Sequence, residues 1–241
     1  MVKTGFVILG LCIASIAQAQ ETIKIGVIGP FTGQSSSDMG ESIRGGARVF
    51  VDEVNRFGGV LGHKIELVEK DDQAKPNIGV DLTKELIEKD KVIAVVGFAN
   101  FAVAQAAVPL LQKAQIPLIV SAAAGGEITL QPNLPPNAPN FIFRVAGRDM
   151  LQTKAMFKDL VDRRKFTNIA ILHDVTAYGE GGKANALADL TARGMKPVSI
   201  ESFKIGDKDM SIQLQKARAA GAQAIALYGL AVEDAMVAKS L

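Results

Sequence analysis

Short apolar runs alternate along the chain with longer segments of helical periodicity. The runs have the length and β-branched content of buried strands, and between them apolar residues recur every three or four positions, as in amphipathic helices. We predict strands at residues 23–28, 64–69, 92–96, 118–120, 141–144, 168–172, 197–203 and 224–228. Strands that alternate with helices predict βα units on parallel sheets, and therefore an α/β fold.

Two predicted helices in the first half of the chain are well marked. One spans residues 38–57 and ends at Gly58 and Gly59, which suit a helix stop. Its predicted core face consists of Ile43, Ala47, Phe50, Val51 and Val54. The other spans residues 77–89, with Ile78, Leu82 and Leu86 on its core face.

Residues 92–112 carry no charged side chain, so a transmembrane helix has to be weighed. Gly97, Asn100, Gln105 and Pro109 interrupt the run, and its composition changes from β-branched to alanine-rich at Gly97. These features favour a buried strand followed by a buried helix.

The segment QPNLPPNAPN at residues 131–140 is rich in proline and asparagine, which predicts a surface loop. The βα pattern resumes after it with FIFRVAGRD. We therefore predict an N-terminal α/β lobe over residues 20–145 and a second, partial α/β lobe over residues 146–241.

The first 19 residues have the layout of a secretory signal peptide: Lys3, an apolar stretch at residues 6–16, and small residues at Ala17 and Ala19. Leu11 precedes Cys12, where a lipoprotein precursor would need a small residue. We expect cleavage after Ala19, loss of the only cysteine, and export to the periplasm.

Composition and motifs narrow the functions that fit. The formal net charge is +2 and is spread along the chain, which argues against nucleic acid as a partner. His63 and His173 stand apart from other metal ligands, and the chain has no phosphate-binding, dinucleotide or nucleophile motif. We expect no metal, no cofactor and no catalytic site; an exported enzyme would require a pocket of convergent titratable groups.

Binding remains, and ligands of parallel sheets lie beyond the carboxyl ends of the strands. Five glycine-rich or small-residue loops follow predicted strands: GPFTGQSSSDMG, GFANF, SAAAGG, HDVTAYGEGG and YGLAVE. Asn100 occupies the predicted N-cap of a helix, where its side chain would cap free N–H groups or bind ligand. Phe101 can serve either as a core side chain or as a platform for a ligand.

The chain resembles the type I periplasmic substrate-binding proteins of ABC transporters, in the branched-chain amino acid (Leu/Ile/Val-binding) class. The resemblance rests on IKIGVIGPFTG, VNRFGGVLGHKIELVEKDD, VVGFAN, IPLIVSAAA, FIFRVAGRD, LHDVTAYGEGG and ALYGL, which occur in the family's order. It implies two Rossmann-like parallel-sheet lobes joined by a hinge, a small-molecule ligand between them, and an inner-membrane ABC permease as partner. We expect a monomer.

The resemblance also implies which residues contact the ligand. The positions that match the family's contact loops and second-lobe aromatics are Ser37, Met39, Asn100, Phe101, Ala102, Ala122, Ala123, Ala124, Tyr178 and Tyr228. Amino-acid binders usually have hydroxyl groups where Phe101 and Ala124 stand here, so an amide or an aromatic carboxylate is an alternative to a branched-chain amino acid.

Members of the family are longer than this chain, which ends at VEDAMVAKSL. We therefore expect a C-terminally truncated form with an incomplete second lobe. Two alternatives to a transport function are a receptor subunit of the same fold that senses its ligand, and a fragment that binds nothing.

Overall fold

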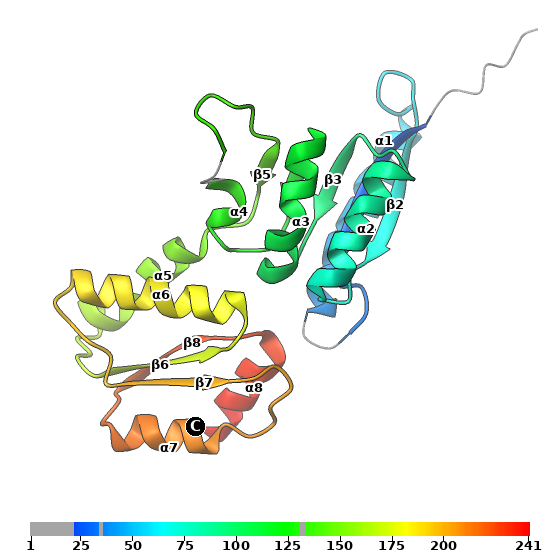
Figure 1. Ribbon diagram of the computed structural model, residues 1–241. Coiled ribbons are helices and arrows are strands. Elements are labelled where there is room, and N and C mark those ends of the chain that lie inside the picture. Colours follow the sequence, from blue (N-terminus) through cyan, green and yellow to red (C-terminus); the bar gives the residue numbers. More distant parts are fainter. Residues whose placement is uncertain (1–21, 34–35, 131–133) are drawn as a thin grey trace, which may run out of the picture.

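The computed structural model describes residues 22–33, 36–130 and 134–241. The predicted signal peptide and part of the proline-rich loop lie outside these residues. The described chain forms two α/β lobes, each built around its own parallel sheet (Figure 1).

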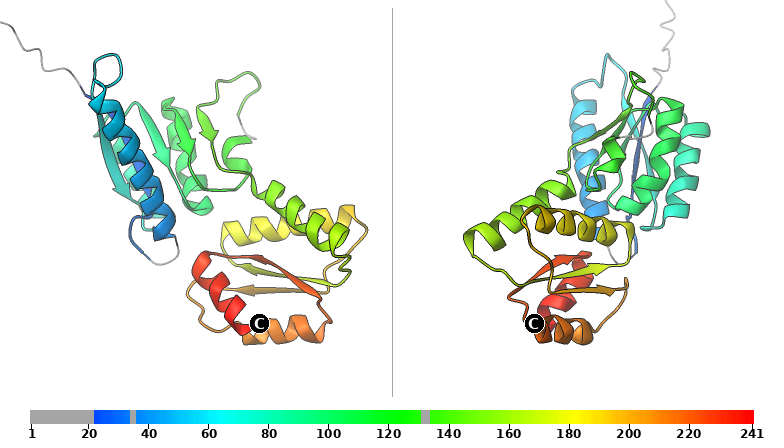
Figure 2. Two further views of the ribbon diagram at one scale, coloured as in Figure 1. Left: turned by 180° about the vertical axis from the view of Figure 1, so that it is seen from behind. Right: turned by 60° about the vertical axis from the view of Figure 1, so that its left-hand side comes forward.

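The first lobe contains a five-stranded sheet in the order β2-β1-β3-β4-β5. Its strands are β1 (Ile23–Gly29), β2 (Ile65–Asp71), β3 (Ala94–Gly97), β4 (Leu118–Val120) and β5 (Ile142–Arg144). Its helices are α1 (Ser37–Arg56), α2 (Pro76–Glu88), α3 (Phe101–Ala114) and α4 (Glu127–Leu130). The helices α2 and α3 pack side by side on one face of the sheet, and α1 covers β1 and β2 on the other (Figures 1 and 2).

The second lobe contains a three-stranded sheet in the order β7-β6-β8. Its strands are β6 (Ile169–Asp174), β7 (Ser199–Phe203) and β8 (Ala224–Tyr228). Its helices are α5 (Asp149–Phe157), the π-helical turn η1 (Lys158–Arg163), α6 (Ala177–Ala192), α7 (Ser211–Ala219) and α8 (Ala231–Ser240). Residues 145–148 connect β5 to α5, and the predicted domain boundary falls in this connection.

Alternating strands and helices place one continuous core in the first lobe. Strand residues Ile28, Val95 and Leu118 pack against the face of α3 that carries Val103 and Leu111, and all five side chains are fully buried. The prediction of a strand followed by a helix within residues 92–112 is confirmed by β3 and α3. Within the described part of the chain, no helix is both long and apolar enough to cross a membrane.

All eight strands were predicted within two residues of their observed bounds, and β4 and β8 coincide with the prediction. The predicted core face of α1 was wrong at Phe50, whose side chain is 64 % exposed. Because α1 covers only β1 and β2, near one edge of the sheet, its buried stripe is narrow and contains Val51 but not the neighbouring Phe50.

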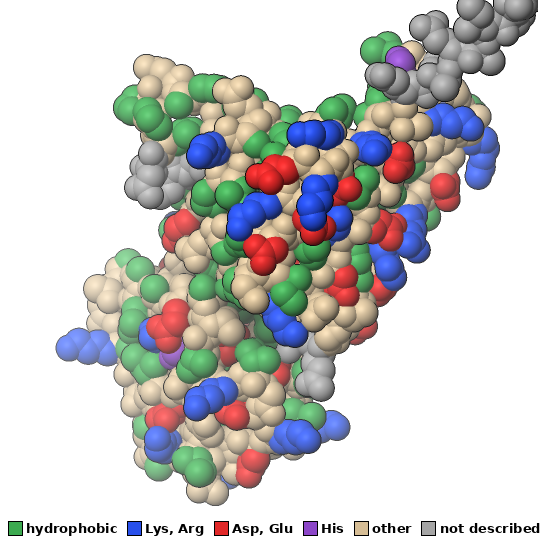
Figure 3. Space-filling model, turned by 45° about the vertical axis from the view of Figure 1, so that its right-hand side comes forward, with side chains coloured by type: hydrophobic (Ala, Val, Ile, Leu, Met, Phe, Trp, Pro, Cys, Tyr) green, Lys and Arg blue, Asp and Glu red, His purple; other side chains and the backbone are tan. Residues whose placement is uncertain are grey.

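Acidic and basic side chains are intermingled on the face of the first lobe shown in Figure 3. Ion pairs in the first lobe join opposite charges: Lys70 contacts both Glu85 and Asp90, and Lys84 contacts Asp81. These pairs balance the formal charges of their members locally.

Candidate ligand-binding cleft

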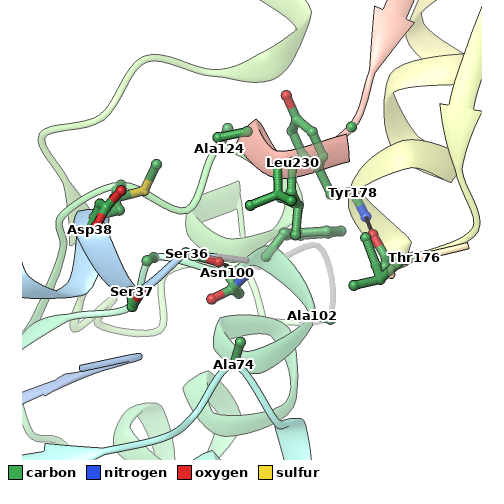
Figure 4. Close-up of a pocket in the computed structure, with 18 of the residues that line it drawn as sticks. Ser36, Ser37, Asp38, Ala74, Asn100, Ala102, Ala124, Thr176, Tyr178 and Leu230 are labelled. Carbon is green, nitrogen blue, oxygen red and sulfur yellow. Dashed lines mark hydrogen bonds between the residues drawn. The ribbon is translucent and has the colours of Figure 1, made fainter. Parts of the chain in front are cut away.

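A cavity of about 440 Å³ lies between the two lobes. Figure 4 shows residues of both lobes around it. The first lobe contributes Ser36, Ser37, Asp38, Met39, Ala74, Ala99, Asn100, Phe101, Ala102, Ala122 and Ala124. The rest of the lining consists of Gln152, Thr176, Tyr178, Ile205, Gly229, Leu230, Ala231 and Val232.

The loop between β3 and α3 forms the centre of the first-lobe wall. Gly97 has a φ of +150°, and a Cβ at this position would lie 2.0 Å from the carbonyl oxygen of Ile28. Only glycine fits such a close approach of two backbones. This tight packing at the end of β3 directs Asn100, Phe101 and Ala102 into the cavity lining.

Asn100 occupies the N-cap position of α3, as predicted, but its side chain makes no capping hydrogen bond. Its amide nitrogen instead donates to Ser36 Oγ across 2.7 Å. Its Oδ1 atom is buried and has no partner among the described residues. The expectation that the Asn100 side chain caps the helix is therefore wrong, and the first N–H groups of α3 have no side-chain cap.

Phe101 packs in the core and also lines the cavity. Its side chain is only 8 % exposed and belongs to the first-lobe core, yet the residue also lines the cavity. Its ring rests against Gly125, where a Cβ would lie 2.0 Å from the ring edge. The core contact is thus an observation, and contact with a ligand remains a prediction.

The second-lobe wall is built where β6 meets α6 and where β8 meets α8. Thr176 caps α6, because its Oγ1 accepts from the Tyr178 N–H across 3.2 Å. Asp174 accepts from the N–H and the hydroxyl of Thr176. Tyr178 also packs against the core of the first lobe, so it lies where the two lobes meet.

The electrostatic environment of Tyr178 is acidic. Burial raises the pKa of its hydroxyl, and the nearby Asp234, Asp174 and Asp149 raise it further. Burial likewise raises the pKa of Asp234 to about 6, with Asp174 and Glu233 adding to the effect. Asp38 is the only charged side chain in the described lining of the cavity, so no lysine, arginine or histidine there supplies a countercharge.

Eight of the ten predicted site residues line the cavity: Ser37, Met39, Asn100, Phe101, Ala102, Ala122, Ala124 and Tyr178. The structure does not place Ala123 and Tyr228 on its wall. Ala123 is 1 % exposed and packs in the first-lobe core. Tyr228 is 7 % exposed, and its hydroxyl lies 3.1 Å from the Thr153 hydroxyl.

Sequence reasoning missed Ala74, Ile205 and Gln152 as lining residues. Ala74 and Ile205 follow the carboxyl ends of β2 and β7, so the rule that identified the other loops would have found them had it been applied to every strand. Gln152 lies on α5, after the connection between the lobes, and no local sequence signal marks it.

The profile of the family described as "Periplasmic binding protein" matches residues 22–239. This chain belongs to that family. An amino acid binding protein of Pseudomonas aeruginosa is 32% identical to it, over 92% of this chain and 59% of the relative. Leu/Ile/Val-binding protein homolog 3 of Brucella melitensis is 30% identical, over 95% of this chain and 59% of the relative.

Structural similarity agrees with this membership. A solute binding protein of an ABC transporter from Rhodopseudomonas palustris, solved with 3,4-dihydroxybenzoic acid, is 29% identical and superposes with a TM-score of 0.73. The match covers 86% of this chain and 54% of that one. The predicted fold class, a type I periplasmic binding protein, is thereby confirmed. This periplasmic binding protein spans about 59% of the length of the curated relatives that it matches.

Proposed function

We propose that this chain is the substrate-binding part of an ABC uptake system, and that its cavity holds a small molecule with a carboxylate or amide head and an apolar or aromatic body. The observation that carries the proposal is the position of the α3 N-terminus, which contributes Asn100, Phe101 and Ala102 to the wall of a cavity between two lobes. Free N–H groups at a helix N-terminus attract anions without the help of a cationic side chain.

The size and lining of the cavity support a ligand of this kind. Its volume of about 440 Å³ is within the usual range for small-molecule sites. Most of the side chains around it are apolar, including Phe101, Ala122, Ile205 and Leu230. A ligand can therefore place a polar head at α3 and bury an apolar body against the second lobe.

The names of the relatives support a carboxylate as the common feature. One relative is named for amino acids, another for leucine, isoleucine and valine, and a third was solved with a dihydroxybenzoic acid. All of these compounds carry a carboxylate on a body that is wholly or partly apolar. The two classes differ in the α-ammonium group, which only the amino acids carry.

A ligand panel tests the proposal on the intact chain. Calorimetry and thermal unfolding would be followed with leucine, isoleucine, valine, 3,4-dihydroxybenzoate and isovaleramide. A ligand present at about 100 times its Kd stabilises the folded state by about 2.7 kcal/mol, which is an increase of several degrees in Tm. We expect such an increase for at least one class, and no response to any compound would contradict the proposal.

A pair of variants on one helix locates the site. Ala102→Leu adds bulk inside the cavity, whereas Ala106→Leu adds the same bulk at an exposed position of α3 that does not line it. We expect Ala102→Leu to weaken binding at least tenfold and Ala106→Leu to leave it unchanged. Equal affinities in the two variants would place the ligand elsewhere.

The partnership with a membrane permease is the second part of the proposal. It predicts that cells lacking the gene lose uptake of the radiolabelled compound that the purified chain binds in the ligand panel. Unchanged uptake together with tight binding would instead favour a role in sensing.

A further inference from the structure

Arg144 stands at the last position of β5, directly before the connection that leads to the second lobe. Residues 145–148 lead from β5 to α5, the first helix of the second lobe. Lobes joined by such a connection move relative to one another unless their interface is large and hydrophobic. Contacts near this connection can therefore influence how the lobes are oriented.

The guanidinium of Arg144 binds three groups of the loop that follows β4. Its Nη1 donates to the Ala124 carbonyl across 2.9 Å, its Nε donates to Thr129 Oγ1 across 3.0 Å, and its Nη2 donates to the Gly125 carbonyl. A planar guanidinium holds two adjacent carbonyl groups in a fixed geometry, whereas the three donors of a lysine ammonium rotate on a flexible stem. Arg144 thus fixes the path of this loop.

The same loop contacts the second lobe. The carbonyl oxygen of Ala124 also accepts from the N–H of Asp149, the first residue of α5, across 3.1 Å. The carboxylate of Asp149 lies between the lobes: a Cβ built on Gly126 would be 4.0 Å from its Oδ1, and one built on Gly181 of α6 would be 3.9 Å from its Oδ2. One carbonyl group therefore joins Arg144 to the beginning of the second lobe.

The loop held by Arg144 also reaches the cavity. Ala122 and Ala124 line it, and Gly125 supports the ring of Phe101. On the other side of the junction, Ala177 and Tyr178 of α6 pack against the first-lobe core. A change in the loop would alter both the cavity wall and the surface on which α6 rests.

We propose that Arg144 is a positioning residue that sets the orientation of the two lobes, through the carbonyl groups of Ala124 and Gly125. Without the guanidinium, Ala124 keeps only its bond to Asp149, and the loop between β4 and α4 is free to shift. The second lobe then samples a wider range of orientations. The inference concerns the lobes alone and does not depend on which ligand the cavity takes.

The test measures the distance between the lobes in the intact chain without ligand. The only cysteine is removed by Cys12→Ser, and spin labels are attached through Lys84→Cys on α2 and Gln215→Cys on α7, both exposed positions. Pulsed electron paramagnetic resonance then gives the distribution of distances between the labels. Circular dichroism and thermal unfolding report separately on whether the lobes are folded.

We expect Arg144→Gln to broaden the distance distribution by about twofold, as a hinge released from a local contact would. Arg144→Lys keeps the positive charge but lacks the planar set of donors, so it should broaden the distribution to an intermediate extent. Arg163→Gln is the matched control, because Arg163 is exposed and pairs with Asp159 within η1, outside the connection between the lobes. Its distribution should equal that of the parent.

A folded Arg144→Gln variant with the parent distribution would overturn the inference, even if its Tm were lower, since a purely local role changes stability without changing orientation. If Arg144→Gln does not fold, Arg144→Lys and Thr129→Val decide the question. Thr129→Val removes one of the three contacts, and parental distributions in both of these variants would overturn the inference. Loss of ligand binding has no bearing on this result, so it is separable from the test of the proposed function.

Discussion

Asn100 and Ser36 stand 64 positions apart in the sequence, and a hydrogen bond of 2.7 Å from the Asn100 amide to Ser36 Oγ joins them. Ser36 is the N-cap of α1 and Asn100 is the N-cap of α3. Neither side chain caps its own helix, so the bond ties two helix N-termini together at the cavity. Two positive helix ends thereby face the same space.

Asn100→Asp should weaken both ligand binding and folding. The Oδ1 atom of Asn100 is buried without a partner among the described residues, so a carboxylate there loses more in solvation than the charge gains at the helix end. The same charge repels a carboxylate ligand, and we expect its affinity to fall at least tenfold, or about 1.4 kcal/mol. Calorimetry and thermal unfolding measure the two effects.

Asn77→Asp is the control for this pair of effects. Asn77 lies in the first turn of α2, is exposed and does not line the cavity. At this exposed position the added charge of Asn77→Asp should stabilise α2 by about 0.5 kcal/mol without changing ligand affinity. Equal affinities of the Asn100 and Asn77 variants for every carboxylate would exclude an anion site at α3.

Gly125→Ala should destabilise the first lobe, whereas Gly126→Ala should not. A Cβ at Gly125 would meet the ring of Phe101 at 2.0 Å, but one at Gly126 would come no closer than 3.8 Å to any atom. Overpacking of this kind costs about 2 kcal/mol. Urea unfolding of the two variants tests the difference, and equal free energies of unfolding would show that the ring of Phe101 moves without cost.

The strands and the loops at their carboxyl ends could be predicted because buried strands have apolar, β-branched sequences and one topological rule locates ligands. Side-chain roles within those loops could not. The sequence marks Asn100 as a cap, but the position of Ser36 decides that the Asn100 amide donates to Ser36 Oγ instead. Tyr228 ends β8 and Tyr178 follows β6, yet only the tertiary packing places Tyr228 in the core and Tyr178 on the cavity wall. Such contacts depend on distant segments, which local patterns do not specify.

Tyr228→Phe should lower stability and leave ligand affinity unchanged. The Tyr228 hydroxyl is buried and lies 3.1 Å from the Thr153 hydroxyl. Removing the Tyr228 hydroxyl leaves the Thr153 hydroxyl without this partner. A loss of about 1 kcal/mol is expected. Thr153→Val and the double variant complete a thermodynamic cycle, in which the double variant should lose less than the sum of the single variants.

Calorimetry on Tyr228→Phe separates the core role from ligand contact. Tyr178→Phe is the comparison, because Tyr178 lines the cavity and Tyr228 does not. If ligand affinity falls in Tyr228→Phe but not in Tyr178→Phe, Tyr228 contributes to the binding site and the core role does not account for it.

Asp72→Asn should stabilise the protein above pH 6 and have little effect near pH 3. The Asp72 side chain is fully buried, its Oδ1 accepts from the Ala74 N–H, and its Oδ2 has no partner among the described residues. Burial raises the pKa of Asp72 from 3.8 to about 6, against the lowering effect of that hydrogen bond. The protonated carboxyl is therefore the form that favours the folded state, and stability falls as the pH rises from 3.8 to about 6.

A shift of about two pKa units corresponds to at most about 3 kcal/mol. The free energy of unfolding is measured in urea from pH 3.5 to 7.5. In the parent it should fall with rising pH, and in Asp72→Asn the part of this fall that is due to Asp72 should disappear. The part that is due to Asp234, whose pKa is raised in the same direction, should persist. Asp81→Asn, at an exposed carboxylate that pairs with Lys84, is the control and should follow the parent curve. Parallel curves for parent and Asp72→Asn would mean that the Asp72 carboxylate is solvated or paired in the folded protein, because only an isolated buried charge produces the divergence.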